Sequence, residues 1–568
     1  MFVSERASGM EPRPQHCVSS WKRYLSPQGS ARVGILMPED VSLTGKRWLP
    51  PEKSGQTAGD AIAYLLHSRK LDISVSPPVF PHMEQAVERI FAAVKRRERI
   101  AIFGDYDCDG ITATAQLVRF FRRRGLDPLI RLPHRVHDGY GLNTAIVEEF
   151  HRAGIQLLIT VDNGISAVQE IALAKQYGME TIVTDHHTVG TDIPPASIIL
   201  HPELAGCPGP HPSGAGVVFL LLQALEKGTW GEEPTDLVLA MCGTVADLVE
   251  LRGYNRQLVR EGLTALQNLS AGPLMLLREY TGTRTSTDVA FRLAPRINAA
   301  GRLGDPLLAL QALLEGGGAI GELDALNMSR QQQTQDLYRE IRHSLDESSP
   351  LLFSADTTYP HGLIGLIAGK LTEATGKPSC IVTVSGDECI ASLRSPPCYH
   401  ITQGLVRCSE LLSRFGGHAC AAGCNFPLRN MTAFERQLTS DIAQHTQKQD
   451  LQPFLQVDAT IPPADITLDL CTTLETLEPF GAGNPEPRFL LEGVHLEGAR
   501  TVGAENTHLQ CSVAGRKSIG FHLAPLLSKL DAPLDVLCRL QIDSWNGYRQ
   551  PQLIIDDVRV TKRAPVSL

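Results

Sequence analysis

The sequence predicts an α/β protein of several domains, and three observations carry that prediction. At 568 residues the chain is too long for one hydrophobic core, so we expect three or four domains. From about 60 to 250, apolar runs alternate with helical patterns, which is typical of βαβ units and a parallel sheet. The C-terminal part contains a series of strand candidates, which indicates a small β-barrel.

The first elements are those of the parallel sheet. Before them, residues 1–45 are polar with scattered Pro and Gly, and we expect a poorly ordered leader. Helices at Gly110–Arg124 and Ser166–Tyr177 separate several of the strands. The strand candidates are Ile100–Phe103, Pro128–Leu132, Leu157–Val161, Thr181–Thr184 and Ser197–Leu200.

Three regions follow the sheet. The pattern is mostly helical over 233–315, and residues 319–346 predict a long polar helix that connects two domains. A second α/β region at about 350–445 contains strands at Ile381–Val384 and Cys389–Leu393. In the C-terminal part, Asn546-Gly547 predicts a hairpin turn. The strand candidates there are His508–Val513, Ser518–His522, Val536–Ile542 and Gln552–Asp557.

Composition excludes several classes of protein. No stretch approaches the 18 or so apolar residues of a membrane span, and residues 1–30 lack a signal-peptide core, so we expect a cytoplasmic protein. The 13 cysteines are scattered without a Cys-x-x-Cys pair, so neither a zinc site nor a disulfide framework follows. The net charge of −9 does not suggest nucleic-acid binding, but a local patch decides that question. The basic clusters at 95–99 and 122–124 are, taken alone, more typical of exposed helix faces.

A run of alternating acids follows the first strand. Asp105, Asp107 and Asp109 lie within the segment Gly104–Gly110, directly after an apolar run. Carboxylates this close repel one another unless a cation neutralises them, and oxygen ligands favour Mg²⁺, Mn²⁺ or Ca²⁺. An EF-hand loop would need a Glu at its twelfth position, where this chain has Gln116. A solvated acidic turn is the other alternative.

Three further apolar runs also end in acids or histidines. Leu157–Val161 leads to Asp162, Thr181–Thr184 leads to Asp185-His186-His187, and Met241–Val245 leads to Asp247. Because the carboxyl ends of parallel strands meet at one edge of a sheet, we expect these side chains to converge. Asp and His together suit two Mn²⁺ or Mg²⁺ ions bridged by a carboxylate.

In this order, the motifs Asp-Tyr-Asp-x-Asp-Gly, Val-Asp-Asn-Gly and Asp-His-His resemble the DHH phosphoesterase superfamily, and within it the single-strand-specific DNA exonucleases. The resemblance covers about Trp48 to Asp557. It includes Gly243–Val249 and Leu293–Arg302, while Phe415–Gly423 resembles the accessory DHHA1 domain and Pro479–Pro487 the entry to an OB-fold.

The resemblance implies an α/β fold in which a DHH domain with a parallel sheet is joined by a helix to a DHHA1 α/β domain. An OB-fold β-barrel follows at the C-terminus. The implied divisions are a leader (1–45), the DHH domain with a helical extension (46–318), the connecting helix (319–347), the DHHA1 domain (348–446) and the OB-fold (447–568).

The resemblance also implies the site residues. Asp185 is expected to orient the histidines rather than bind metal. Residues expected to act in catalysis are Asp107, Asp109, Asp162, His187 and His418. The implied metal ligands are Asp105, Asp107, Asp109, Asp162, His186, His187 and Asp247.

DNA contacts are implied in the same way, since Arg can bind a phosphate with two hydrogen bonds. The chain departs from the family at Ala391-Ser392-Leu393-Arg394-Ser395, where a glycine is usual in place of Leu393, and at Pro360-His361-Gly362, where Trp-His-x-Gly is usual. These departures put the details of end recognition in doubt. The implied DNA-binding residues are Arg135, Tyr140, Arg296, Asn298, Arg302, Ser392, Arg394, Gly416, Gly417 and His418.

The implied activity is two-metal hydrolysis that releases mononucleotides 5′→3′ from single-stranded DNA, in recombination and repair. The implied partners are a RecQ-type helicase and single-strand-binding protein, with the enzyme itself a monomer. A related phosphodiesterase for short oligonucleotides, cyclic dinucleotides or pyrophosphate would not need the C-terminal barrel. A catalytically inactive strand-binding scaffold should have lost ligands, and here the six core positions are filled.

Overall fold

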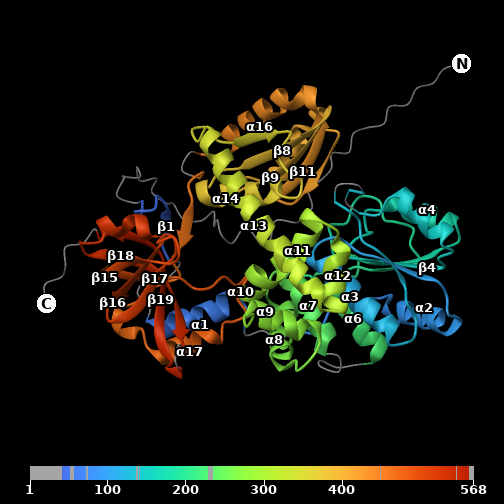
Figure 1. Ribbon diagram of the computed structural model, residues 1–568, viewed down its shortest axis with the longest axis horizontal. Helices are drawn as coiled ribbons and strands as arrows, with labels where there is room; N and C mark the ends of the chain where they lie inside the picture. The colour runs from blue at the N-terminus through green and yellow to red at the C-terminus, as the bar shows by residue number, and fades with distance from the viewer. Residues whose placement is uncertain are drawn as a thin grey trace, which may run out of the picture. The chain divides into compact units, whose positions relative to one another are not determined.

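The computed structural model describes most of the chain from Val41 onward (Figure 1). Residues 1–40, Tyr140 and Asn546 lie outside the described part, and with them most of the predicted leader and half of the predicted hairpin turn. No helix in the described part is long and apolar enough to cross a membrane. The described residues are 41–51, 57–71, 75–135, 138–139, 141–227, 234–447, 450–544 and 547–561.

A five-stranded, fully parallel sheet has the order β3-β2-β4-β5-β6. The prediction of this sheet is confirmed, with each strand within two residues of its expected bounds. Strands β2 and β4 are buried throughout, as expected for apolar runs covered on both faces. The strands are β2 (Ile100–Phe103), β3 (Leu129–Arg131), β4 (Leu157–Val161), β5 (Glu180–Thr184) and β6 (Ile198–Leu200).

Helices cover both faces of this sheet (Figure 1). On one face lie α2 (Met83–Arg96), α3 (Cys108–Arg122) and α6 (Gly214–Glu226), within the largest apolar cluster. On the other lie α4 (Thr144–Arg152) and α5 (Val168–Gln176), in a separate cluster. Helix α3 is buried along nearly its whole length, so its first turn, which follows β2, is held firmly.

The next region is helical, as predicted, but it corrects one expectation. Met241–Val245 lies inside a buried helix, α7, and not in a strand, so Asp247 follows a helix end. A short run that is apolar on every side does not distinguish a buried helix from a buried strand. The elements are α7 (Pro234–Ala246), α8 (Gly253–Asn268), α9 (Pro273–Thr281), α10 (Ser286–Asp288), η2 (Val289–Leu293), α11 (Ala294–Leu303) and α12 (Pro306–Leu314).

The long helix α13 (Gly318–Ser344) leads out of this region. Its first turns contribute Ala319, Ile320 and Leu323 to the core of the parallel-sheet region. Near its other end, Ile341 packs in a cluster with residues of the second α/β region. One helix thus takes part in two hydrophobic cores.

The second α/β region has the strand order β10-β11-β9-β8-β7, in which only the β7–β8 pair is parallel. Helix α14 contributes to one apolar cluster, and α15 and α16 to another. The elements are β7 (Leu352–Asp356), α14 (Ile364–Thr375), β8 (Ser379–Ser385), β9 (Glu388–Arg394), α15 (Ile401–Arg407), η3 (Ser409–Leu411), β10 (Arg414–Gly417), β11 (Ala421–Pro427), η4 (Leu428–Asn430) and α16 (Met431–His445).

The C-terminal region is a seven-stranded sheet in the order β13-β14-β18-β19-β17-β16-β15. Among the described residues β13 and β15, the outermost strands, are not paired with each other. The sheet therefore has two open edges, whereas the sequence predicted a closed barrel. The elements are β12 (Phe454–Gln456), β13 (Ala459–Thr460), η5 (Pro463–Asp465), α17 (Leu468–Glu475), β14 (Phe489–Val494), β15 (Leu496–Val502), β16 (His508–Val513), β17 (Arg516–Gly520), η6 (Ala524–Lys529), β18 (Leu534–Asp543) and β19 (Gln550–Val560).

The start of the described chain packs against this C-terminal region, although the sequence suggested that it begins the DHH domain. Strand β1 (Arg47–Leu49) pairs with β12, and α1 (Ala58–Ser68) places its apolar face in the C-terminal cluster. Even Leu43, expected in the leader, donates a backbone hydrogen bond to Val558 at 2.9 Å. An amphipathic pattern predicts a buried helix face but not which core will cover it.

Candidate metal centre

The acidic run lies where β2 ends and α3 begins. Asp107 is the N-cap of α3, and its Oδ1 accepts from the backbone N–H groups of Asp109 (3.0 Å) and Gly110 (3.1 Å). Asn298 of α11 accepts from the backbone N–H of Cys108 at 2.8 Å. These bonds fix the direction of the acidic loop. Asp105 and Asp109 are buried, and burying their negative charges is costly in free energy unless a cation is near.

The other predicted ligands arrive from three elements. Asp162 follows β4 in the left-handed backbone region, with φ of 59°, a conformation that a non-glycine residue adopts at a cost and that is frequent at functional sites. His186 and His187 follow β5, and Asp247 lies one residue beyond α7. The acidic loop, Asp162 and the histidine pair thus lie at carboxyl ends of parallel strands, as expected.

The structure brings these side chains together around His186. Its Nε2 lies 3.1 Å from Asp162 Oδ1, 3.6 Å from Asp247 Oδ2 and 3.7 Å from Asp109 Oδ2. Asp105, Asp107 and Asp162 form a second group, whose ligand atoms all lie within 4.8 Å of one another. Asp162 is shared between the two groups, which is the arrangement expected of a carboxylate that bridges two ions.

Two buried atoms in this cluster indicate that it binds a cation. Asp162 Oδ1 and His186 Nε2 are inaccessible to solvent and, although they lie 3.1 Å apart, neither forms a hydrogen bond with the other or with any other described atom. Such atoms are rare in folded proteins because they lose their hydration without compensation. A divalent ion between them would satisfy both, and the set of carboxylate oxygens and imidazole nitrogen suits Mn²⁺ or Mg²⁺.

Burial and mutual repulsion perturb the acids strongly. Burial, with the charge of Asp107, raises the pKa of Asp105 to about 8 and that of Asp109 to about 6. The same two causes, burial and neighbouring carboxylates, raise the pKa of Asp162 and Asp247 well above the ordinary range. Burial, with the charge of His187, lowers the pKa of His186 to about 3, so its ring is neutral and free to bind a metal.

Asp185 contacts both histidines of the pair, and the orienting role expected of it stays a prediction. Its Oδ1 accepts from the backbone N–H groups of His186 (2.7 Å) and His187 (3.1 Å), and lies 2.7 Å from His187 Nδ1. Burial alone would raise the pKa of Asp185, but the bond and charge of His187 lower it to about 2. The bond leaves His187 Nε2 as the atom that can face a metal.

Replacement of Asp185 by Asn should therefore weaken metal binding without removing a ligand. We expect Mn²⁺ affinity to fall roughly 10- to 100-fold, the usual effect of losing a carboxylate that orients a histidine ligand. Titration calorimetry with Mn²⁺ measures it. Asp192→Asn, at an exposed aspartate a few residues along, is the control. Equal affinity in both variants would contradict the orienting role.

Sequence reasoning missed the part played by the start of α6. Gly214 and Ala215 donate their backbone N–H groups to the two oxygens of Asp109, at 2.7 and 3.0 Å. A Cβ at position 214 would collide with Asp162, and one at 243 with Asp109, so these glycines allow the acids to approach the helices. Ser213 before an apolar run is an N-cap signal, but it does not reveal what the helix end will hold.

Some predicted DNA contacts also gather near the acidic loop. The guanidinium of Arg135 stacks over the Tyr106 ring at 4.2 Å, and Arg302 donates to the backbone oxygen of Gly362 at 3.2 Å. Arg394 donates to Ser392 Oγ at 3.3 Å. Burial, with the charges of Arg135, Arg330 and Arg394, lowers the pKa of Arg302 to about 9. These cations therefore lie close enough to repel one another.

The remaining predicted contacts differ in their surroundings. Arg296 forms an ion pair with Asp324 at 2.8 Å, and Asn298 supports the acidic loop. Gly416 and Gly417 lie on β10, an edge strand, and only Gly417, with φ of 140°, has a backbone that favours glycine. His418 follows them, and burial and the charge of His187 lower its pKa. Tyr140 lies outside the described residues.

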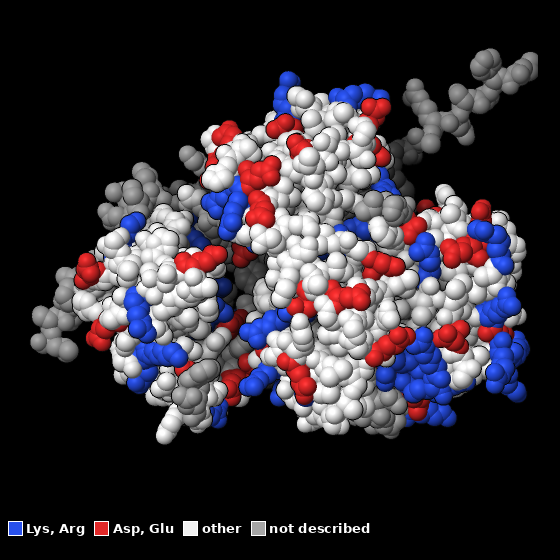
Figure 2. Space-filling model, viewed as in Figure 1, with Lys and Arg blue, Asp and Glu red and all other residues white. Residues whose placement is uncertain are grey.

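The basic clusters found in the sequence are away from this centre. In Figure 2 the densest blue patch lies low on the right, in the part of the view that holds α2 in Figure 1. Arginines of the 122–124 cluster, at the end of α3, are paired: Arg122 with Asp127 at 3.0 Å, and Arg123 with Asp236 at 2.9 Å. The prediction of ordinary, solvated helix faces fits them.

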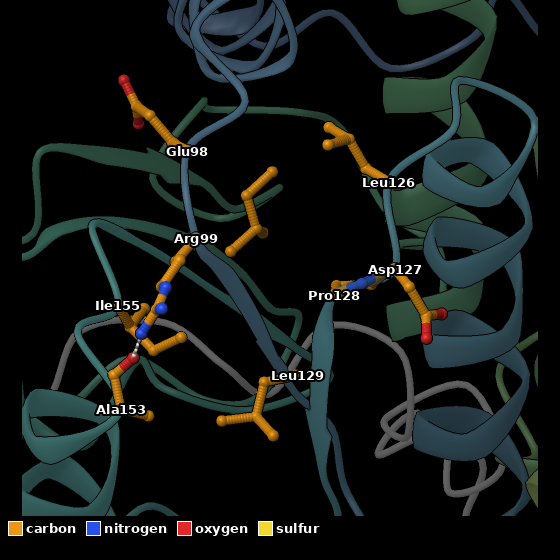
Figure 3. A pocket seen from close by; sticks show the side chains of 9 residues that line it. Glu98, Arg99, Leu126, Asp127, Pro128, Leu129, Ala153 and Ile155 are labelled. Carbon is orange, nitrogen blue, oxygen red and sulfur yellow. Dashed lines mark hydrogen bonds between the residues drawn. The ribbon is translucent and has the colours of Figure 1, made fainter.

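A cavity of about 320 Å³ lies next to these clusters, at the amino ends of β2, β3 and β4. Figure 3 shows Leu126, Leu129 and Ile155 on its walls and the bond from Arg99 to the backbone oxygen of Ala153 (2.8 Å). The acids of the metal centre follow the opposite, carboxyl ends of β2 and β4. Because it lies at the opposite ends of these strands, the cavity does not belong to the metal site.

Fold and site together define a metal-dependent phosphoesterase of the DHH class. The model of the DHH family, N-terminal domain, matches residues 99–246, and that of the RecJ OB domain matches residues 457–557. The chain belongs to the RecJ family of single-stranded-DNA-specific exonucleases.

Relatives and solved structures support this membership over most of the chain. The RecJ exonuclease of Thermus thermophilus is 34% identical over 88% of this chain and 75% of its own, and that of Salmonella typhimurium is 32% identical over 84% and 90%. The crystal structure of the Thermus thermophilus RecJ in complex with Mn²⁺ has a TM-score of 0.78 at 31% identity, covering 94% of this chain and 81% of that one.

Proposed function

We propose that this protein is a metal-dependent exonuclease that hydrolyses single-stranded DNA from its 5′ end and releases mononucleotides. The observation that carries the proposal is the convergence of acids and histidines around the unpartnered atoms Asp162 Oδ1 and His186 Nε2. Family membership supports the substrate, since the relatives are named single-stranded-DNA-specific exonucleases. A RecJ structure that carries Mn²⁺ and another that carries Mg²⁺ support those cations.

The proposed metal ligands are the seven predicted ones. Asp109, His186 and Asp247 would hold one ion, and Asp105, Asp107 and Asp162 would hold another. His187 would bind an ion through its Nε2, because its Nδ1 forms a hydrogen bond with Asp185. When bound, the ions supply a nucleophile activated at neutral pH and neutralise charge on the leaving oxygen.

The protein's own groups then position the strand. Arg135, Arg302 and Arg394, whose mutual repulsion an anion relieves, are proposed to bind phosphate oxygens near the acidic loop. His418, close enough to His187 for their charges to interact, is proposed to contact the scissile phosphate. Asn298 holds the acidic loop while these contacts form. The C-terminal region is proposed to hold more distant nucleotides through stacking and phosphate contacts.

Two other functions have less support. A phosphodiesterase for short oligonucleotides or cyclic dinucleotides would not need the RecJ OB domain at residues 457–557. An inactive strand-binding scaffold would not be expected to keep acids and histidines together at the observed distances. Both alternatives remain outcomes of the test below.

The test is one digestion series with Mn²⁺ or Mg²⁺. It compares 5′- and 3′-labelled single-stranded DNA, duplex DNA and RNA, and reads product length over time. We expect the 5′ label to appear first as a mononucleotide, with duplex DNA resistant. Release of the 3′ label first would overturn the polarity. Cleavage confined to very short strands would favour the alternative phosphodiesterase, and no cleavage of any substrate would favour the inactive scaffold.

The remaining expectations are proposals of the same kind. We propose that the second α/β region is a DHHA1 domain and that the protein is a cytoplasmic monomer. The proposed partners are a RecQ-type helicase and single-strand-binding protein. Co-purification with the two partners and light scattering of the purified protein would test the partner and the oligomeric proposals separately.

A further inference from the structure

One face of the connecting helix α13 carries two buried polar atoms that have no hydrogen-bond partner among the described residues. They are Arg330 Nε and Thr334 Oγ1. Residues four apart on a helix lie one above the other on the same face. Thr334 is only 2% exposed, so water does not compensate its hydroxyl. The described protein thus leaves these two donors without an acceptor, which is rare for buried polar atoms.

The charge of Arg330 is not neutralised by the residues around it. Its Nη2 donates to the side-chain oxygen of Asn327 at 2.9 Å, which supplies no negative charge. Asp324, on the same helix, already binds Arg296 (2.8 Å) and the Tyr280 hydroxyl (3.0 Å). Among the described residues no carboxylate forms an ion pair with Arg330.

Arg330 is also part of a larger positive cluster next to the acidic loop. Burial and the charge of Arg296 lower the pKa of Arg330, and Arg330 in turn lowers that of Arg302. Helix α13 packs on α11, which carries Arg302, and on α14. Asp107 raises the pKa of Arg302, but its effect is smaller than the lowering caused by burial and by each of the three neighbouring arginines. An anion beside Arg330 would offset this repulsion.

We propose that Arg330 and Thr334 bind a phosphate group of the DNA strand, so that the connecting helix forms part of the strand-binding site. This inference rests on the proposed function. A guanidinium and a hydroxyl one helical turn apart can donate together to the oxygens of one phosphate. The phosphate is either the terminal 5′ group or an internal diester, because both offer the same acceptor oxygens.

The test measures binding of a single-stranded oligonucleotide by fluorescence anisotropy in EDTA, over a range of salt concentrations. Arg330→Ala should weaken binding about tenfold and reduce the slope of log K against log salt by about 0.7, the value for one phosphate contact on a single strand. Arg330→Lys should keep the slope but lose part of the affinity, since lysine keeps the positive charge but cannot donate two parallel hydrogen bonds as a guanidinium does. Thr334→Val should weaken binding without changing the slope.

The matched control is Arg339→Ala. Arg339 lies on the same helix, but its side chain is 59% exposed and 3.9 Å from Asp336, so its loss should change neither affinity nor slope. Melting temperatures of all variants separate a folding defect from lost binding. A salt slope of Arg330→Ala equal to that of wild type would overturn the proposal.

The two sources of phosphate are separated by the end of the oligonucleotide. A loss confined to strands with a 5′-phosphate assigns Arg330 to the terminal group, and an equal loss on 5′-hydroxyl strands assigns it to an internal diester. Failure of the proposed function would look different, because then the wild-type protein itself would not bind or digest single-stranded DNA.

Discussion

Replacing Asp107 by Asn should reduce the turnover of single-stranded DNA by roughly 10²- to 10³-fold, the scale of losing one preorganised electrostatic group. The carboxylate lies in the Asp105–Asp107–Asp162 group and is also the N-cap of α3. Asparagine keeps an oxygen that can cap the helix, so the fold should survive while the ligand charge is lost. Product release over time gives the turnover.

Binding separates this loss from a general defect. Affinity for a single strand in EDTA should be unchanged or slightly higher, because one negative charge near the phosphates is gone. Asp305→Asn is the matched control, since Asp305 caps α12 in the same way through a bond to Leu307 N–H (2.9 Å) but lies outside the cluster. Wild-type turnover in Asp107→Asn would remove Asp107 from the site.

The second large effect concerns stability without metal. Between pH 6.5 and 8, the metal-free protein should lose stability as the pH rises, and Mn²⁺ should reduce this dependence. The folded pKa of Asp105, about 8, lies above its ordinary value of 3.8, because burial favours the protonated form. Stability from that proton is complete below pH 4 and is lost as the pH rises through about 8.

His187 acts in the same direction. Burial alone would lower its pKa, but the hydrogen bond and charge of Asp185 raise it to about 9, so its proton also stabilises the fold until the pH approaches that value. His186, with a pKa of about 3, stays neutral throughout this window. Each of the two groups contributes on the order of 1 kcal/mol per pH unit.

Melting temperature against pH, with EDTA and with Mn²⁺, measures this dependence. The shift produced by Mn²⁺ should be larger at pH 8 than at pH 6.5, because the ion takes the place of protons that the cluster otherwise keeps. Asp105→Asn should show a flatter metal-free curve than wild type. The same slope in both proteins would show that Asp105 is ionised without metal, contrary to the effect of its burial.

The sheet and the acids on its edge could be predicted because local signals determine them. Strands such as β4 are unbroken apolar runs because both faces of the sheet are covered. Asp162 and Asp185 come directly after such runs, so they lie at the carboxyl edge of the sheet. Asp247 was predicted as a site residue, but the apolar run before it was taken for a strand end and is part of the helix α7. The two are hard to distinguish because α7 is apolar on all sides.

Long-range packing could not be predicted in the same way. Nothing local in the sequence indicates that Asn298 will support a loop 190 residues earlier, or that Arg330 will lie close enough to Arg302 to lower its pKa. The side chain of Arg69 likewise reaches Asp458 at 2.9 Å. Each of these contacts depends on how two distant elements meet, and pattern and propensity within a window do not contain that information.

The packing of α1 on the C-terminal sheet has a consequence for synthesis on the ribosome. Roughly 400 residues separate α1 from the first strands that cover its apolar face. At about 5–20 residues per second, that face waits about 20–80 s for its partner while the parallel sheet and its helices are already complete. During that interval the apolar side chains of Ile62 and Leu65 are exposed to water, and the C-terminal cluster can form only after both α1 and the strands that cover it have been synthesised.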